Sequence, residues 1–210
     1  MKNIFLITTV ITLFTLNSYC QLDEKTWLVG GTGSFNSFKT IESTTVQYLT
    51  STETIKIQRN SKVFEINPKL GFFIIDKLVL GLSLTFTNEK SNSITLEGNS
   101  SGGISNSKFF LIGPFARYYF LEKDKNFNIL LEANYQIGNS NAFNLSESKN
   151  KINSINLFIG PEIFFNSSVG MEFLFGYKRY NLKNDNINYI SSTENGFQIA
   201  IGFQIHLEKN

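Results

Sequence analysis

The sequence predicts an all-β fold, an eight-stranded antiparallel transmembrane up-and-down β-barrel with short periplasmic turns and long extracellular loops. Three observations predict it. Apolar residues alternate with small or polar ones along most of the chain, the connections between these segments are short and long in turn, and the chain begins with an export signal. We expect residues 1–20 to be a signal peptide and residues 21–210 to form one barrel domain.

The first twenty residues have the pattern of a signal peptide. Lys2 supplies the positive charge, and the uncharged run Ile4–Leu16 has the length of a signal-peptide core, too short for a membrane-spanning helix. Ser18 and Cys20 are the small residues that signal peptidase requires, so we predict cleavage between Cys20 and Gln21.

An alternative makes Cys20 a lipid-modified N-terminus. That signal needs a small residue before the cysteine and an apolar one three positions before it, and Tyr19 and Asn17 fit neither place. Cys20 is the only cysteine of the chain, so no internal disulfide can form in the mature protein.

Period-two alternation defines the strands. The last strand alternates the apolar residues Phe197, Ile199, Ile201, Phe203, Ile205 and Leu207 with small or polar ones. The same pattern predicts eight strands: 27–38, 62–74, 78–88, 108–120, 127–139, 153–165, 169–180 and 196–207. The connections 75–77, 121–126 and 166–168 are short, whereas segments such as 89–107 and 181–195 are longer and rich in Asn, Ser, Thr and Gly. This asymmetry is typical of outer-membrane barrels.

A secreted β-sandwich or a soluble lipocalin-like barrel would alternate as well. The charges within the strands lie opposite the apolar stripe, which fits a membrane barrel but also a sandwich whose charged face meets water. Aromatic residues near the strand ends favour the membrane barrel, because they suit its interfacial girdles: Trp27, Phe120, Phe127, Phe165 and Phe203.

Several motifs resemble a known family. Leu111–Phe115 (LIGPF) and Phe158–Glu162 (FIGPE) repeat each other, and Trp27–Gly31 (WLVGG), Pro68–Leu78 (PKLGFFIIDKL) and Gly113–Phe120 (GPFARYYF) complete the pattern. Together they resemble the outer-membrane β-barrel domain family common in Bacteroidota. The resemblance implies a small OmpX-like or OmpA-like barrel, and it implies no particular activity, because most members of the family have none assigned.

The last strand also resembles a barrel-assembly signal. Gly202, Ile205 and Leu207 have the spacing of a glycine followed by two apolar residues that the assembly machinery reads in C-terminal strands. Aliphatic residues stand where aromatic ones are usual, and Glu208–Asn210 follow, which departs from the usual motif.

Charged residues on the inner face predict a charge-paired lumen. If the strand at 108–120 keeps the register of the strand at 153–165 through their shared Gly-Pro, Arg117 points inward. An arginine facing lipid near the bilayer midplane would cost about 2–4 kcal/mol, which independently favours this placement. Buried charges are tolerated only when paired, so we expect three cations to compensate four glutamates. The predicted network consists of Glu65, Lys69, Arg117, Glu132, Glu162, Glu172 and Lys178. An alternative is that this cluster forms a proton or ion relay, or a catalytic carboxylate pair.

The composition argues against several functions. Charged residues make up 17% of the chain and the net charge is +2, so no basic face for nucleic acid is expected. His206 is the only histidine, and we expect it at the periplasmic rim rather than in a catalytic site. We predict no catalytic residues, no metal site and no cofactor, and an envelope enzyme dependent on His206 is the least favoured function.

The sequence thus predicts a non-enzymatic protein of the outer membrane of a Gram-negative bacterium. Its plugged, charge-paired lumen suggests a structural or surface-interaction role, because eight strands leave room for little more than their own side chains. The alternative is a narrow conduit for small solutes or hydrophobic ligands. The expected partners are outer-membrane lipid and lipopolysaccharide, the barrel-assembly machinery, and an unidentified extracellular partner at the loops. We expect a monomer.

Overall fold

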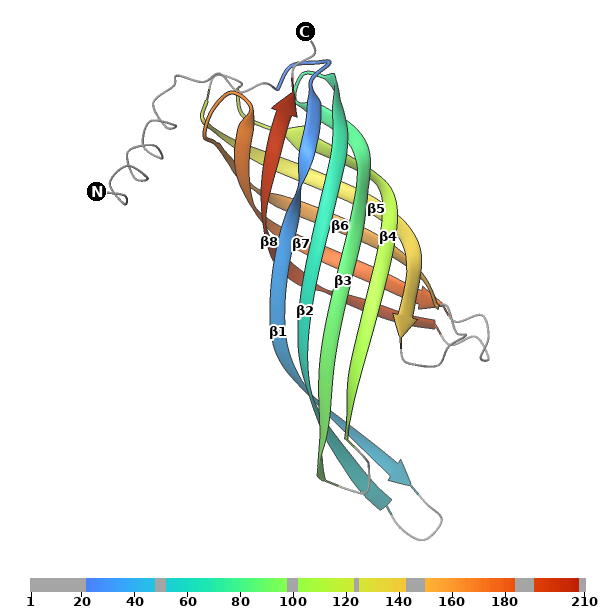
Figure 1. Ribbon diagram of the computed structural model, residues 1–210. Coiled ribbons are helices and arrows are strands. Elements are labelled where there is room, and N and C mark those ends of the chain that lie inside the picture. Colours follow the sequence, from blue (N-terminus) through green and yellow to red (C-terminus); the bar gives the residue numbers. More distant parts are fainter. Residues whose placement is uncertain are drawn as a thin grey trace, which may run out of the picture.

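The computed structural model describes residues 22–47, 52–97, 102–122, 125–142, 150–183 and 191–207. Within these ranges, eight strands form one closed antiparallel barrel in chain order, which confirms the predicted fold class (Figure 1). The strands are β1 (Trp27–Gln47), β2 (Thr52–Ile75), β3 (Leu78–Glu97), β4 (Gly103–Tyr119), β5 (Phe127–Ala142), β6 (Asn150–Phe164), β7 (Val169–Lys183) and β8 (Ser191–Leu207). The predicted signal peptide and its cleavage site lie outside the described residues.

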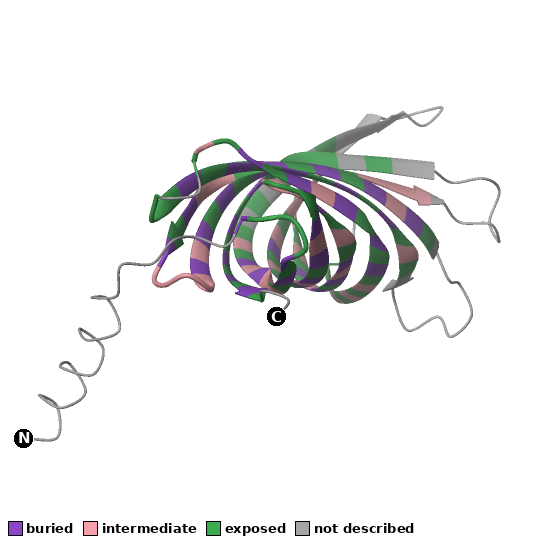
Figure 2. Cartoon of the chain, turned by 90° about the horizontal axis from the view of Figure 1, so that it is seen from above, coloured by how far each residue is buried: buried purple, intermediate pink, exposed green. Residues whose placement is uncertain are grey.

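Buried and exposed residues alternate along the strands, as Figure 2 shows. In β4, Phe115, Arg117 and Tyr119 are buried inside the barrel, whereas Pro114 and Tyr118, at alternate positions, are exposed on its outer face. The alternation follows from strand geometry, since successive side chains point to opposite faces of a sheet. The barrel therefore has a polar, charged interior and an apolar exterior.

Closure of the barrel depends on a short ladder between the first and last strands. β1 pairs with β8 only from Trp27 opposite Leu207 to Gly33 opposite Ile201, whereas it pairs with β2 along its whole length. Past Gly33 the two strands are no longer paired. The hairpin of β1 and β2 consequently reaches beyond the rest of the barrel (Figure 1).

The strands are longer than the sequence predicts. Much of the polar segments 89–107 and 181–195, expected to be loops, is strand: β3 runs to Glu97, β4 begins at Gly103, and β7 runs to Lys183. Alternation of apolar and polar residues reveals only the part of a strand whose outer face is apolar. Beyond it the ladders continue through backbone hydrogen bonds, which polar residues form equally well.

All three prolines of the chain interrupt a ladder in the same way. Pro68, Pro114 and Pro161 lie in β2, β4 and β6, and each ladder to the next strand skips the proline and the residue before it. Proline has no backbone N–H to donate, and a closed barrel has no free edge where that loss is harmless. The repeated Gly-Pro pairs of β4 and β6 thus mark equivalent ladder gaps.

A short N-terminal segment lies across the turn end of the barrel. Lys25 N donates to Phe73 O, Phe73 N donates to Thr26 O, and Lys77 N donates to Leu22 O, each at 2.9 Å. The Leu22 side chain is completely buried within the hydrophobic cluster at the base of the lumen. Among the described residues there is no helix long and apolar enough to cross a membrane.

Candidate functional site in the lumen

Two buried ionic groups occupy the lumen. The structure places all seven side chains of the predicted network inside the barrel, at 0–6% residue exposure. Five of them form the inner group, near the turn end: Lys69, Arg117, Glu132, Glu162 and Glu172. The other two, Glu65 and Lys178, form a separate outer pair, nearer the far ends of the strands.

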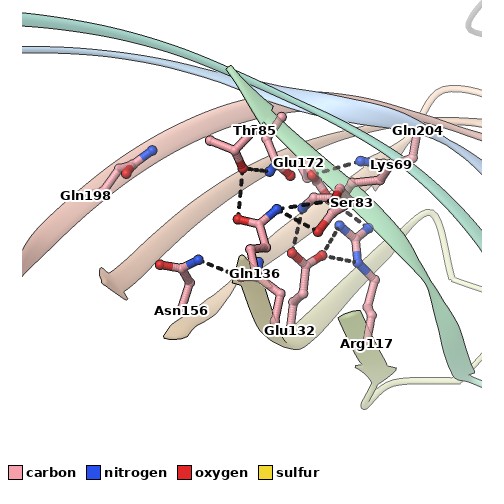
Figure 3. Close-up of polar contacts among 12 residues, drawn as sticks. Lys69, Ser83, Thr85, Arg117, Glu132, Gln136, Asn156, Glu172, Gln198 and Gln204 are labelled. Atoms are coloured by element: carbon pink, nitrogen blue, oxygen red, sulfur yellow. Dashed lines mark hydrogen bonds and ion pairs between the residues drawn. The ribbon is translucent and has the colours of Figure 1, made fainter. Parts of the chain in front are cut away.

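Arg117 is the centre of the inner group. Its Nε and Nη2 atoms donate to Oε2 of Glu132 at 2.9 and 2.6 Å, and its Nη1 lies 2.8 Å from Oε2 of Glu172. Lys69 donates to the other oxygen of Glu132 at 2.6 Å, so two cations converge on one carboxylate (Figure 3). These residues come from β2, β4, β5 and β7, so the ion pairs link opposite sides of the wall.

A histidine and a tyrosine extend the inner group, and sequence reasoning did not include them. His206 Nε2 lies 3.1 Å from Oε1 of Glu162, and the Tyr119 hydroxyl donates to Oε2 of the same carboxylate at 2.8 Å. We expected His206 at the periplasmic rim, and the structure places it inside the turn end of the lumen, completely buried against the rings of Phe73 and Phe164. The period-two pattern of the last strand puts His206 on the same inner face as Gln204, and this could have predicted that it points into the lumen.

Side-chain amides form a layer between the two ionic groups. Gln136 accepts a hydrogen bond from Thr85 at 2.9 Å and donates to the Ser83 hydroxyl at 2.9 Å (Figure 3). Asn156 donates to Asn134 across β5 and β6 at 2.5 Å. The lumen is therefore crosslinked by polar contacts at several levels along its axis.

The outer pair joins strands on opposite sides of the barrel. Lys178 of β7 contacts Glu65 of β2, and the Tyr180 hydroxyl lies beside both. Gln198 of β8 donates to Glu65 at 3.2 Å and to the Ser34 hydroxyl of β1 at 2.7 Å. The latter contact bridges β1 and β8 just beyond the last rung of their backbone ladder.

On the side of the outer pair away from the turn end, the lumen widens into a cavity of about 520 Å³. Glu65 and Lys178 line it together with apolar side chains, among them Val63, Phe109 and Ile152. An external groove of about 510 Å³ between β1 and β8 shares Asn36, Phe197 and Gln198 with this cavity. Where β1 and β8 are no longer paired, the wall thus has the lumen cavity on its inner side and the groove on its outer side.

The predicted assembly motif lies at the closing seam. Gly202 faces the lumen opposite Thr32 of β1 and Glu172 of β7, whereas Ile205 and Leu207 point outward and are about half exposed. A Cβ atom at position 202 would lie 2.8 Å from Oε1 of Glu172, closer than side chains normally approach. Gly202 therefore leaves room for the inner group.

The geometry suits structural pairing rather than chemistry on a substrate. Arg117, Glu132, Glu162, Glu172 and His206 have no exposed surface, so none can meet a molecule from solution without opening the barrel. Burial strengthens each ion pair but makes each unpaired charge costly. The inner group is an interlocked set whose members depend on one another.

Comparison with known proteins identifies the fold and no closer relationship. No family model matches the chain, and no curated protein matches it. The crystal structure of the outer membrane protein OprG from Pseudomonas aeruginosa is similar, with a TM-score of 0.59 and 9% identity, covering 91% of this chain and 100% of that one. Neisserial surface protein A (NspA) matches with a TM-score of 0.46 and 12% identity, covering 86% and 96% of the two chains. At this identity the likeness to OprG is one of fold.

Proposed function

We propose that this chain is a non-enzymatic integral protein of the outer membrane of a Gram-negative bacterium, exported by a cleaved signal peptide, with a structural or surface-interaction role. The lumen is plugged by the two ionic groups, and the turns face the periplasm. The observation that carries the proposal is the combination of an apolar outer wall with an ion-paired interior, the reverse of a soluble barrel.

The outer wall supports placement in lipid. Large apolar side chains such as Leu70, Leu82 and Ile112 are between 42% and 56% exposed, where water would be an unfavourable neighbour. Aromatic residues with exposed surface lie near the turn end, including Trp27, Phe120 and Phe127, which suits one interfacial girdle. A wall of this kind is stable in a bilayer.

The interior supports a plug. Hydrogen bonds and ion pairs connect β2, β4, β5, β6, β7 and β8 through fully buried atoms around Arg117. Between these groups and the turns, Leu22, Leu28 and Phe73 are completely buried and close the turn end with apolar contacts. Ions crossing the lumen would have to displace both layers.

Two measurements test the proposal. Detergent-folded mature protein should run differently on SDS gels before and after boiling, and protein from cells should fractionate with the outer membrane. In planar bilayers the wild type should give no discrete conductance steps. A soluble protein without a heat-dependent shift would refute the membrane placement, and regular conductance steps would refute the plug.

The second candidate is a narrow conduit for small solutes or hydrophobic ligands. The cavity above Glu65 and Lys178, and the groove that shares Gln198 with it, favour this candidate, since a hydrophobic ligand would find apolar walls there. Liposome swelling with small sugars distinguishes the two functions. Swelling at a rate above that of empty liposomes supports a conduit, and its absence supports the plug.

An enzymatic role has little support from the site. His206 contacts Glu162 and aromatic rings in a closed interior, and its side chain has no exposed surface. If the protein is nevertheless found to modify envelope lipids, replacing His206 by Gln should leave that activity intact. Loss of the activity in a folded His206→Gln variant would contradict the non-enzymatic proposal.

A further inference from the structure

Three lysines gather on the outer face of neighbouring strands, just beyond the apolar wall. Lys62 of β2 lies directly opposite Lys90 of β3, and Lys108 of β4 lies diagonally across from Lys90, opposite Asn88. All three side chains are exposed. Directly opposed side chains in a sheet have Cβ atoms about 5 Å apart, and diagonal ones about 7–8 Å, so the three ammonium groups can reach a common ligand.

These lysines have no anionic partner among the described residues. The ion pairs found there join other lysines, such as Lys69, Lys178 and Lys56, to glutamates. Two like charges directly opposite each other destabilise a sheet. The pairing of Lys62 with Lys90 is therefore a cost in the isolated protein, which an external anion would relieve.

An aromatic surface continues from the lysines toward the turn end. In the register of the sheet, Phe64 follows Lys62, and Phe86 pairs with Phe110, their rings 5.1 Å apart. Phe64, Phe86, Phe110 and Lys108 line a groove of about 480 Å³ on this face. A second groove, of about 550 Å³, shares Phe110 and Asn139 with the first and includes Lys151 of β6. Two apolar grooves thus lie side by side, each with a lysine in its lining.

We propose that this face, over β2 to β6, binds one molecule of the acylated, phosphorylated glycolipid of the outer leaflet, the lipid part of lipopolysaccharide. Phosphates meet Lys62, Lys90 and Lys108, and acyl chains lie in the two grooves. Lysine binds phosphate as a point charge. A glycerophospholipid with one phosphate and two chains would leave part of this surface unused. The inference rests on the proposed membrane placement, with the turns in the periplasm.

The test is lipid retention by the full mature protein. Wild-type protein, folded in detergent and shown to be heat-modifiable, is titrated with lipid A and analysed by native mass spectrometry. The variant Lys62→Gln/Lys90→Gln is compared with the control Lys77→Gln/Lys125→Gln, which removes the same charge at the turn end. Two further probes are lipid A lacking its phosphates and phosphatidylglycerol.

We expect the wild type and the control to retain one lipid A with equal affinity. Near a membrane surface each lysine contributes about five-fold to the binding of anionic lipid, so the double variant should bind about 25-fold more weakly. The wild type should bind dephosphorylated lipid A about as weakly as the Lys62→Gln/Lys90→Gln variant binds intact lipid A. Equal binding by both double variants, or binding that does not depend on the phosphates, overturns the site.

Phosphatidylglycerol bound as tightly as lipid A overturns the glycolipid assignment. Failure of the membrane placement has a different signature: the wild type would show no heat-dependent gel shift and would not fractionate with the outer membrane. A heat-modifiable, membrane-bound protein that retains no lipid A therefore refutes this inference alone.

Discussion

Arg117 and Glu132 are direct cross-strand neighbours, and two nitrogens of the guanidinium donate to a single carboxylate oxygen at 2.6 and 2.9 Å. The pair is fixed by the register of β4 and β5, not by a loop or a bound ligand. It leaves Nη1 of the same arginine free to reach Glu172 at 2.8 Å. The ladder between two adjacent strands thus sets the position of the cation on which the inner group depends.

Replacing Arg117 by Leu should lower the unfolding temperature in detergent strongly. The substitution leaves three buried carboxylates with Lys69 as the remaining permanent cation, and removing one partner of a buried pair costs about 3–5 kcal/mol. The readout is the temperature at which the heat-dependent gel shift is lost. Arg179→Leu, on the exposed face of β7, is the matched control and should leave this temperature nearly unchanged. Equal unfolding temperatures for the two variants would rule out the paired lumen.

The glutamates of the inner group should differ in importance. Glu132 receives hydrogen bonds from both Lys69 and Arg117, whereas Glu172 meets Arg117 and the amide of Gln204. The inner group holds three glutamates, Glu132, Glu162 and Glu172, against the two cations Lys69 and Arg117, so neutralising the carboxylate with the weaker contacts should cost less. We expect Glu172→Gln to destabilise the barrel less than Glu132→Gln in urea unfolding from lipid vesicles. The reverse order would show that Glu172 is the main counterion of Arg117.

The outer pair should show a coupling energy in a double-mutant cycle. Glu65→Gln and Lys178→Met each leave one buried charge without its partner, so each alone should destabilise the protein. The double variant should be more stable than the sum of the two single effects, by about 0.5–3 kcal/mol. Urea unfolding of all four proteins measures this. Strict additivity would mean that water, not the partner, stabilises each charge.

The glycines of the repeated Gly-Pro pairs should tolerate no side chain. A Cβ atom at Gly113 would overlap the backbone oxygen of Tyr135, and one at Gly160 would overlap that of Phe173. We expect Gly113→Ala and Gly160→Ala to fold poorly, because backbone cannot move aside in a closed wall. Gly103→Ala is the control, since a Cβ there meets nothing within 4 Å. The yield of heat-modifiable protein is the readout, and normal yields for all three would disprove the steric argument.

The sequence determined the fold class, most of the strand positions, and which face of each strand is polar. Period-two alternation carries that information, because successive side chains of a strand point to opposite faces whatever they contact. The strand ends could not be predicted in this way. Beyond the apolar wall, as in β3 up to Glu97, pairing continues through backbone hydrogen bonds that leave no trace in the hydropathy pattern.

Only the tertiary structure decided which inward residues meet. Closing the barrel places Lys178 beside Glu65 and His206 beside Glu162, although each pair is far apart in the sequence and lies on strands that are not neighbours. Alternation gives the direction of a side chain but not its height along the barrel axis, which depends on the register of every ladder. For the same reason the sequence could not show that Lys62 stands opposite Lys90 on the outer face.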